Sequence, residues 1–343
     1  MNFPNPDDKT FNIIATAIFF CAITHTFFAS FIHRLSKRYP SLYFLGEIEA
    51  VFAIWAFPLA IAITVFYGWD TTINYLAYKV HYTEAMFIVV IMAISSTRPI
   101  LNFCEECLRV IAKIGNESVA AWWIVILTVT PIFGSFITEP AAMTIAAMLL
   151  GRQFYIFKPD YKFKYATIGL LFVNISVGGV LTNFAAPPVL MVASKWNWSS
   201  LFMLQNFGWR AWCGIGISNA LYFFIFRKNF AQLELYKKNH RSLIKDIAKT
   251  TPHWITLAHF LFMLWTVVTA HHPPMFIAGF LLFVAFLKMT KKHQDVLKMQ
   301  SPILVGLFLA GLVIHGGLQG WWIAPLLSSF TEIPLMLAAI TLT

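Results

Sequence analysis

The sequence predicts an all-α polytopic membrane protein built from two inverted repeats with re-entrant hairpins and broken helices, the second repeat incomplete. Hydrophobic residues make up 59% of the 343-residue chain and charged residues only 12%, against about 25% charged residues in soluble domains. Apolar runs of about 20 residues, long enough to cross a bilayer, recur along the chain. Two of these runs, 122–151 and 165–196, are interrupted by glycine, proline and small polar residues. Broken backbone survives in a membrane only where protein or a cavity surrounds it.

The basic residues indicate a topology rather than a nucleic-acid surface. The net charge is +10, and 18 of the 25 Lys and Arg residues fall in four short segments between apolar runs: 34–38, 152–164, 227–249 and 288–298. Basic loops stay on the cytoplasmic side of a membrane. We therefore expect the N-terminus outside, loop 227–249 in the cytoplasm, membrane lipid as the surroundings, and no nucleic acid as a partner.

Three single helices are expected first, at about 12–32, 50–67 and 84–97. The third is interrupted at Arg98-Pro99 and continues in polar form to Lys113. Loops on both sides of segment 119–150 are then expected in the cytoplasm, so a single crossing would violate the charge rule. A re-entrant hairpin satisfies it, with arms of about 15 residues, or roughly 22 Å, and a tip from Pro131 to Pro140.

The remaining segments complete one repeat and begin another. A broken helix at 165–195 and a helix at 201–226 end the first repeat, which spans 1–226. A basic cytoplasmic linker follows at 227–253, and the second repeat spans 254–343. The second repeat is predicted from a shared pattern, Trp-Trp followed by Ser-Phe, Thr-Glu and Pro, at 122–140 and at 321–334. Inverted repeats are common in secondary transporters. Because the second hairpin is followed by no broken helix, we expect the chain to be C-terminally shortened.

Glu139 is the sharpest candidate for chemistry. A carboxylate deep in a membrane segment is costly and indicates function by default. Burial favours its protonated form and a nearby cation its ionised form, so Na⁺ and H⁺ would compete there. The alternative is a structural carboxylate at the N-terminus of the returning helix. Glu332 has the same placement in the second repeat.

Neutral oxygens accompany Glu139 at the two breaks, on Ser135, Thr138, Thr182 and Asn183. Oxygen ligands suit hard cations, although these side chains could equally satisfy the backbone amides freed by the breaks. Backbone-shaping roles are expected for six further residues: Gly134, Pro140, Gly178, Gly179, Pro187 and Pro188.

Other polar residues carry less weight. Arg98 and Arg210 could pair with Glu139 or extend to the membrane surface, and His25, His259 and His315 are expected to be packed rather than proton-relaying. The four cysteines imply no disulfide framework, and Cys104-Glu-Glu-Cys107 is a weak metal signal. The sequence holds no P-loop, H-E-x-x-H or G-x-S-x-G pattern. We therefore expect no resident metal, no cofactor and no enzymatic activity.

Segments 134–155 and 178–198 resemble the bacterial Putative Na⁺/H⁺ antiporter family. That family looks related to the ion-transporter superfamily of NhaB-type antiporters, arsenite permeases and divalent-anion symporters. The resemblance implies a bacterial inner-membrane protein with a cation site at the hairpin tip and the break, where Ser135, Thr138, Glu139, Thr182 and Asn183 match the motifs. It also implies a homodimer.

The sequence thus predicts a secondary active transporter that exchanges Na⁺, or another monovalent cation, for H⁺ by alternating access. Two alternatives stay open. Helix N-termini also attract anions, so an organic-anion or oxyanion permease is the first. A truncated membrane remnant without transport activity is the second.

Overall fold

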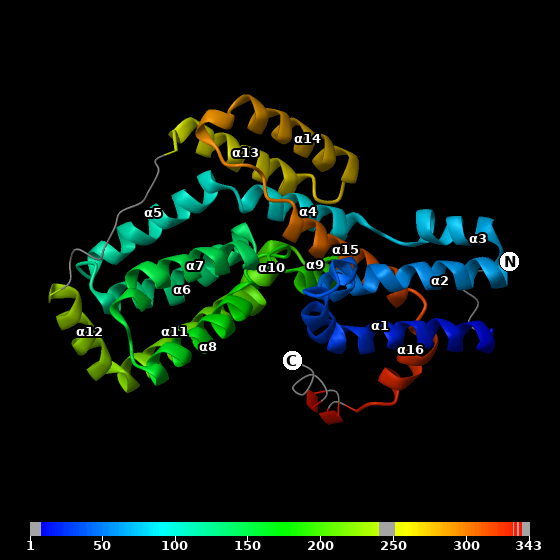
Figure 1. Ribbon diagram of the computed structural model, residues 1–343, viewed down its shortest axis with the longest axis horizontal. Helices are drawn as coiled ribbons and strands as arrows, with labels where there is room; N and C mark the ends of the chain where they lie inside the picture. Colours follow the sequence, from blue (N-terminus) through cyan, green and yellow to red (C-terminus); the bar gives the residue numbers. More distant parts are fainter. Residues whose placement is uncertain (1–7, 240–250, 332, 335, 338–343) are drawn as a thin grey trace. The chain divides into compact units, whose positions relative to one another are not determined.

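The computed structural model describes residues 8–239, 251–331, 333–334 and 336–337, and these residues form helices with no strand among them. The prediction of an all-α fold is therefore confirmed (Figure 1). Within the described residues, three helices are long and apolar enough to cross a membrane, and counting each bent helix pair as one span raises the number to five. This is the composition of a polytopic membrane protein.

The chain divides into two compact units. Unit 1 comprises residues 1–86 and 303–343, and unit 2 comprises residues 87–302. The boundaries fall inside helices α4 (Thr83–Ser95) and α15 (Gln300–Gly316). The compact units group residues by contact, whereas the repeats 1–226 and 254–343 were defined by sequence similarity, so the repeat boundaries stay a prediction.

Unit 1 is held together by polar bonds between its N-terminal helices and the segment after residue 302. Tyr75 donates a hydrogen bond to the carbonyl of Ile314 at 2.6 Å, and Thr16 donates one to Gln319 at 2.9 Å. Its elements besides parts of α4 and α15 are α1 (Lys9–Ser36), η1 (Pro40–Leu42), η2 (Phe44–Gly46), η3 (Ile48–Ala50), α2 (Val51–Tyr67), α3 (Trp69–Asn74), η4 (Tyr75–Lys79) and α16 (Gly320–Ser328).

Unit 2 contains the predicted hairpin and the predicted broken helix. Its elements are the rest of α4, α5 (Arg98–Ile114), α6 (Val119–Ile137), α7 (Glu139–Gln153), η5 (Tyr155–Phe157), α8 (Tyr161–Gly178), α9 (Pro187–Lys195), α10 (Ser200–Met203), η6 (Leu204–Gly208), α11 (Trp209–Ile225), α12 (Arg227–Asn239), α13 (His253–Val268), α14 (Pro273–Met289) and η8 (Lys291–His293). The interruption expected at Arg98-Pro99 separates α4 from α5, because Pro99 has no N–H to continue the hydrogen bonding of α4 and suits a first helical turn.

Helix α6 lies at the centre of unit 2 and packs against α5, α7, α8, α11 and α12. Trp122, Trp123 and Ile126 on α6 are fully buried. The indole of Trp123 donates a hydrogen bond to Thr167 on α8 at 2.9 Å, which satisfies its polar atom inside the core. Because α6 is buried on most of its surface, its position fixes the hairpin of which it is the first arm.

The segment predicted as a linker, 227–253, is partly a core element. Helix α12 occupies its first 13 residues, and Phe230 and Leu233 bury an i, i+3 apolar face in the core of unit 2. Glu234 accepts a hydrogen bond from the backbone N–H of Val119 at 2.8 Å. The segment expected as a basic cytoplasmic linker is thus helical over its first part, and its role as a linker stays a prediction; residues 240–250 and Glu332 lie outside the described residues.

The hairpin differs from its prediction in arm length and tip. Its arms are α6 with 19 residues and α7 with 15, or roughly 28 and 22 Å at 1.5 Å per residue. The tip is not the ten-residue stretch 131–140, because Thr138 is the one residue between the helices. Pro131 and Gly134 lie inside α6. The expected tip was wrong because a proline in a packed helix can be tolerated where neighbouring helices satisfy the freed carbonyl.

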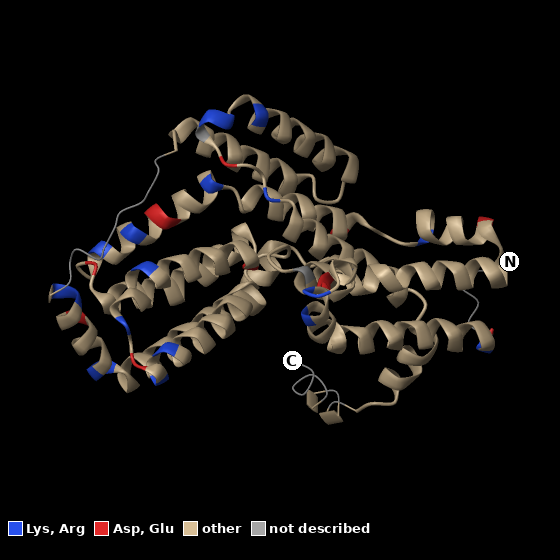
Figure 2. Ribbon diagram, viewed as in Figure 1, with Lys and Arg blue, Asp and Glu red and all other residues tan. Residues whose placement is uncertain are grey.

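Charged residues mark one end of unit 2. Figure 2 shows that the Lys and Arg residues of α12, of the start of α8 and of the end of α5 gather at that end. The first arm of the hairpin begins there and the second arm returns there. The hairpin tip lies at the opposite end of these helices, near α9 and α10 (Figure 1).

Candidate functional site

The hairpin tip is a single strained residue. Thr138 has φ 74° and ψ 151°, a conformation that is essentially restricted to glycine and costs about 1–3 kcal/mol for other residues. Its side chain is 1% exposed. Within the described part of the chain, its hydroxyl oxygen is buried with no hydrogen-bond partner. A buried unpaired hydroxyl is costly, so the tip carries both backbone strain and an unused oxygen ligand.

The break between α8 and α9 spans residues 179–186 and meets the hairpin tip in space. The Ser135 hydroxyl donates to the carbonyl of Gly178 at 2.6 Å and accepts from the N–H of Leu181 at 3.1 Å. Thr182 donates in turn to the carbonyl of Ser135. One serine therefore satisfies the backbone on both sides of the end of α8.

A backbone contact joins the two breaks again on the far side of the tip. The N–H of Glu139 donates to the carbonyl of Ala185 at 3.4 Å. Glu139 is the first residue of α7, where the helix dipole favours a negative charge. Its half-buried carboxylate lies against Gly179, so that a Cβ at Gly179 would lie 3.0 Å from Cγ of Glu139. The carboxylate, the Thr138 hydroxyl and the broken backbone thus form one constellation.

The predicted glycines act through close approach more than through unusual backbone angles. A Cβ at Gly134 would lie 3.3 Å from Cβ of Ala142, so the absent side chain lets the two arms pack tightly. A Cβ at Gly178 would lie 2.8 Å from the carbonyl oxygen of Pro131. Pro140, Pro187 and Pro188 lie in the first turns of α7 and α9, where a missing N–H costs nothing.

Not every candidate joins the constellation. Asn183 lies in the break, but its amide donates to the carbonyl of Trp198 at 3.1 Å and accepts from Ser200 at 2.8 Å. It therefore ties the break to the segment that leads into α10. Ser135, Thr138, Glu139 and Thr182 are the predicted residues that the fold brings to the tip.

The other polar candidates have partners elsewhere. Arg98 pairs with Asp295 at 2.7 Å, and the guanidinium of Arg210 lies 5.5 Å from the ring of Trp209. His25 accepts from Trp55 at 3.0 Å. His259 and His315 are buried and contact backbone carbonyls.

Two buried asparagines that join helices of unit 2 were not predicted from the sequence. Asn174 on α8 and Asn219 on α11 both donate to the carbonyl of Leu127 on α6, at 2.9 and 3.2 Å. They are 1% and 4% exposed. An asparagine within an apolar helix can indicate a buried amide that bonds to another helix. No motif distinguishes these two residues from other asparagines in the chain.

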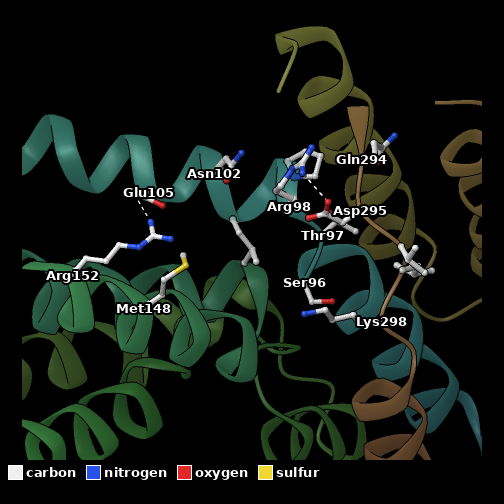
Figure 3. A pocket seen from close by; sticks show the side chains of 14 residues that line it. Ser96, Thr97, Arg98, Asn102, Glu105, Met148, Arg152, Gln294, Asp295 and Lys298 are labelled. Carbon is white, nitrogen blue, oxygen red and sulfur yellow. Dashed lines mark hydrogen bonds and ion pairs between the residues drawn. The ribbon is translucent and has the colours of Figure 1, made fainter. Parts of the chain in front are cut away.

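A cavity of about 370 Å³ lies at the other end of α7 (Figure 3). The two residues between α4 and α5, one face of α5, the end of α7 and the segment at 294–298 line it. The Glu105 carboxylate accepts from Arg152 at 3.4 Å and from Arg109 at 3.5 Å. Two ion pairs at this cavity thus tie α5 to its neighbours: Glu105–Arg152 joins it to α7, and Arg98–Asp295 joins it to the segment after α14.

The all-α fold and its long apolar helices define a polytopic membrane protein. The chain belongs to the Putative Na⁺/H⁺ antiporter family, whose model matches residues 10–343. The family places it among the cation/proton antiporters rather than the enzymes. No curated protein and no solved structure matches the chain.

Proposed function

We propose that the chain exchanges Na⁺, or another monovalent cation, for H⁺ across a bacterial inner membrane by alternating access. The observation that carries the proposal is the meeting of the hairpin tip with the break 179–186. The carboxylate of Glu139 and the buried, unpaired hydroxyl of Thr138 stand beside broken backbone. Hard cations take oxygen ligands of these kinds.

Competition at one carboxylate gives the exchange. A proton on Glu139 removes the charge that attracts Na⁺, and a bound Na⁺ favours the ionised carboxylate. The site then holds one ion or the other, and each is carried when the site is exposed to alternate sides of the membrane. We assign the ion contacts to Ser135, Thr138, Glu139 and Thr182, with Asn183 holding the break from behind.

The observed donors favour a cation over an anion. A permease for oxyanions would use the backbone N–H groups at the starts of α7 and α9. Pro140, Pro187 and Pro188 lie in these first turns and remove three such donors. The Glu139 carboxylate would also repel an anion at the tip.

We also propose a second hairpin, because the segment around α16 resembles the first hairpin. Helix α16 begins at Gly320, beside Trp321 and Trp322, as α6 begins near Trp122 and Trp123. It ends at Ser328, and residues 333–334 and 336–337 are helical. Two helical pieces therefore flank a Ser-Phe-Thr segment, as α6 and α7 meet around Ser135, Phe136 and Thr138. We propose that 1–226 and 254–343 are inverted repeats and that loop 227–249 is cytoplasmic.

Proteoliposomes with a preformed pH gradient test the function. Addition of Na⁺ outside should collapse the gradient, as followed by a pH-sensitive dye, and Glu139→Gln should abolish the response. Glu106→Gln, on the exposed face of α5, is the matched control and should respond like the parent chain. Failure of Na⁺, Li⁺ and K⁺ to collapse the gradient would overturn the proposal. Retained exchange in Glu139→Gln with an unshifted pH profile would remove Glu139 from the site.

A further inference from the structure

The first arm of the hairpin contains a helix defect about two turns before the tip residue Thr138. Pro131 lies inside α6 and has no backbone N–H. The carbonyl of Leu127, four residues earlier, therefore lacks the N–H that would normally bind it in an α-helix. Leu127 is fully buried. An unsatisfied carbonyl in such a place costs several kcal/mol in a membrane, so the fold has to supply a donor from elsewhere.

Two other helices supply it. Asn174 on α8 donates to this carbonyl at 2.9 Å, and Asn219 on α11 donates to it at 3.2 Å. The two amides are also joined, since Asn174 donates to Asn219 at 2.8 Å. Asn219 donates further to the hydroxyl of Thr128 at 2.9 Å. We call Asn174 and Asn219 the amide clamp.

The clamp lies close to the proposed ion site along a continuous set of contacts. Pro131 abuts Gly178, where a Cβ would lie 2.5 Å from Cβ of Pro131. Gly178 in turn accepts the hydrogen bond from Ser135. The contact between Pro131 and Gly178 thus lies between the amide clamp and the hydrogen bond of Ser135. From Leu127 to Ser135 is eight residues, or about 12 Å along the helix.

We propose that Asn174 and Asn219 are positioning residues for the cation site: by binding the Leu127 carbonyl that Pro131 frees, they fix the turns of α6 that hold Ser135 and Glu139 against the break. This inference rests on the proposed function for its transport consequence. Its structural part, that the clamp orders the hairpin tip, does not depend on which ion is carried. Three helices converge on one backbone oxygen, so loss of either amide lets the upper turn of α6 move.

Pro131→Ala provides the decisive partner variant. Alanine restores the N–H that bonds to the Leu127 carbonyl and keeps the Cβ that touches Gly178. In the parent chain, Asn219→Ala should raise the half-saturating Na⁺ concentration about fivefold and shift the pH profile of exchange, as expected for one lost buried hydrogen bond. In the Pro131→Ala background the same change should have less than about half that effect, because the carbonyl is already satisfied.

A matched control lies beside the clamp. Ser218→Ala removes a hydroxyl that bonds only within its own helix, to the carbonyls of Gly214 and Ile215. Its Na⁺ dependence should equal that of the parent chain. Asn174→Ala is the second clamp variant and should behave like Asn219→Ala. Size-exclusion profiles and thermal unfolding establish that each variant is folded.

A readout without transport separates the two proposals. Hydrogen–deuterium exchange of peptides covering 132–141 should be faster in Asn219→Ala than in the parent chain and in Ser218→Ala, and slower again in the double variant with Pro131→Ala. If the parent chain moves no cation but exchange at the tip responds in this way, the transport function fails and the clamp stands. Unchanged exchange at the tip and unchanged Na⁺ dependence in both clamp variants would overturn the clamp.

Discussion

The carboxylate of Glu139 lies directly against Gly179, the first residue of the break after α8. A Cβ at Gly179 would lie 3.0 Å from Cγ and 3.1 Å from Cδ of Glu139 and would overlap Oε1. Glycine is thus required there for a side chain to lie across it rather than for a special backbone angle. The hairpin tip and the break are fitted to each other at this pair of residues.

Gly179→Ala should displace the carboxylate while leaving the fold intact, because the obstructed atoms belong to a flexible side chain. We expect the half-saturating Na⁺ concentration for gradient collapse to rise about tenfold or more, since misplacement by about 1 Å can cost about a hundredfold at a reacting site. The free energy of unfolding should change by less than about 1 kcal/mol. Dye-based exchange in proteoliposomes and thermal scans measure the two quantities.

Gly169→Ala is the matched control, because a Cβ at Gly169 on α8 meets no atom within 4 Å. Alanine also has the higher helix propensity, by about 1 kcal/mol. Its exchange should equal that of the parent chain. If Gly179→Ala transports with parental Na⁺ dependence, the contact between Glu139 and Gly179 does not set the ion site.

Thr138→Gly separates the strain at the tip from the oxygen that the tip carries. Glycine adopts the observed φ of 74° without penalty, so relief of strain should offset the loss of packing and leave the chain at least as stable. The lost hydroxyl should weaken Na⁺ dependence at the same time. Thr138→Ser keeps the hydroxyl and should retain Na⁺ dependence. Parallel thermal scans and Na⁺ titrations measure both effects, and parental Na⁺ dependence in Thr138→Gly would exclude this oxygen as a ligand.

The sequence predicted features that depend on local rules. Gly178-Gly179 predicts the end of α8, and Pro187-Pro188 predicts the start of α9. The division of α4 from α5 follows from Pro99. Membrane-spanning helices are predicted from the length of their apolar runs alone. These features depend on residues close together in the chain, so one sequence suffices to find them.

Features that depend on partners distant in sequence escaped prediction. Pro131 was expected to end a helix arm, but α6 continues because Asn174 and Asn219 satisfy the freed carbonyl. These asparagines lie 47 and 92 residues from Leu127, and only the fold brings them together. Helix α12 was hidden for a similar reason, since its two buried apolar residues, Phe230 and Leu233, stand in a basic segment.

The N-terminus of α1 supplies a pH-dependent contact in unit 1. Asp8 accepts hydrogen bonds from the hydroxyl of Tyr67 and, at 3.1 Å, from the N–H of Phe11. The bond from Tyr67, then that from Phe11, lowers the pKa of Asp8 below its ordinary value. A lowered pKa means that the contribution to stability is present above the ordinary value, about 3.9, and is lost as the pH falls through the folded-state pKa.

Thermal scans between about pH 6 and pH 3 should therefore show a small loss of stability in the parent chain that Tyr67→Phe reduces. The effect is small because Asp8 is partly exposed to solvent. Tyr78→Phe, at an exposed tyrosine of the same unit, is the control and should keep the parental pH dependence. Identical acid profiles for the parent chain and Tyr67→Phe would show that this hydrogen bond contributes nothing.

The two ion pairs of Glu105 should contribute differently to stability, because they join different elements. Arg109 lies on the same helix as Glu105, in an i, i+4 pair, and such pairs contribute about 0.3–0.5 kcal/mol. Arg152 lies in the last turn of α7 and connects the second hairpin arm to α5 (Figure 3). The Glu105 side chain is only 9% exposed, so its attraction to Arg152 is less screened than that of a surface pair.

A double-mutant cycle between Glu105→Gln and Arg152→Met should give a coupling energy of about 1 kcal/mol, and the cycle with Arg109→Met about half of that. Methionine retains an apolar stem, so the cycle reports the charge rather than lost packing. Chemical or thermal unfolding measures, for each cycle, the change in unfolding free energy of the two single variants and of the double variant. Hydrogen–deuterium exchange of 148–153 locates the loosened segment. Because Arg152 lies in the last turn of the helix that begins with Glu139, the Arg152 variant should also speed exchange along α7, whereas the Arg109 variant should not. A coupling energy near zero between Glu105 and Arg152 would show that Glu105 stabilises its own helix alone and leaves the hairpin arm unanchored.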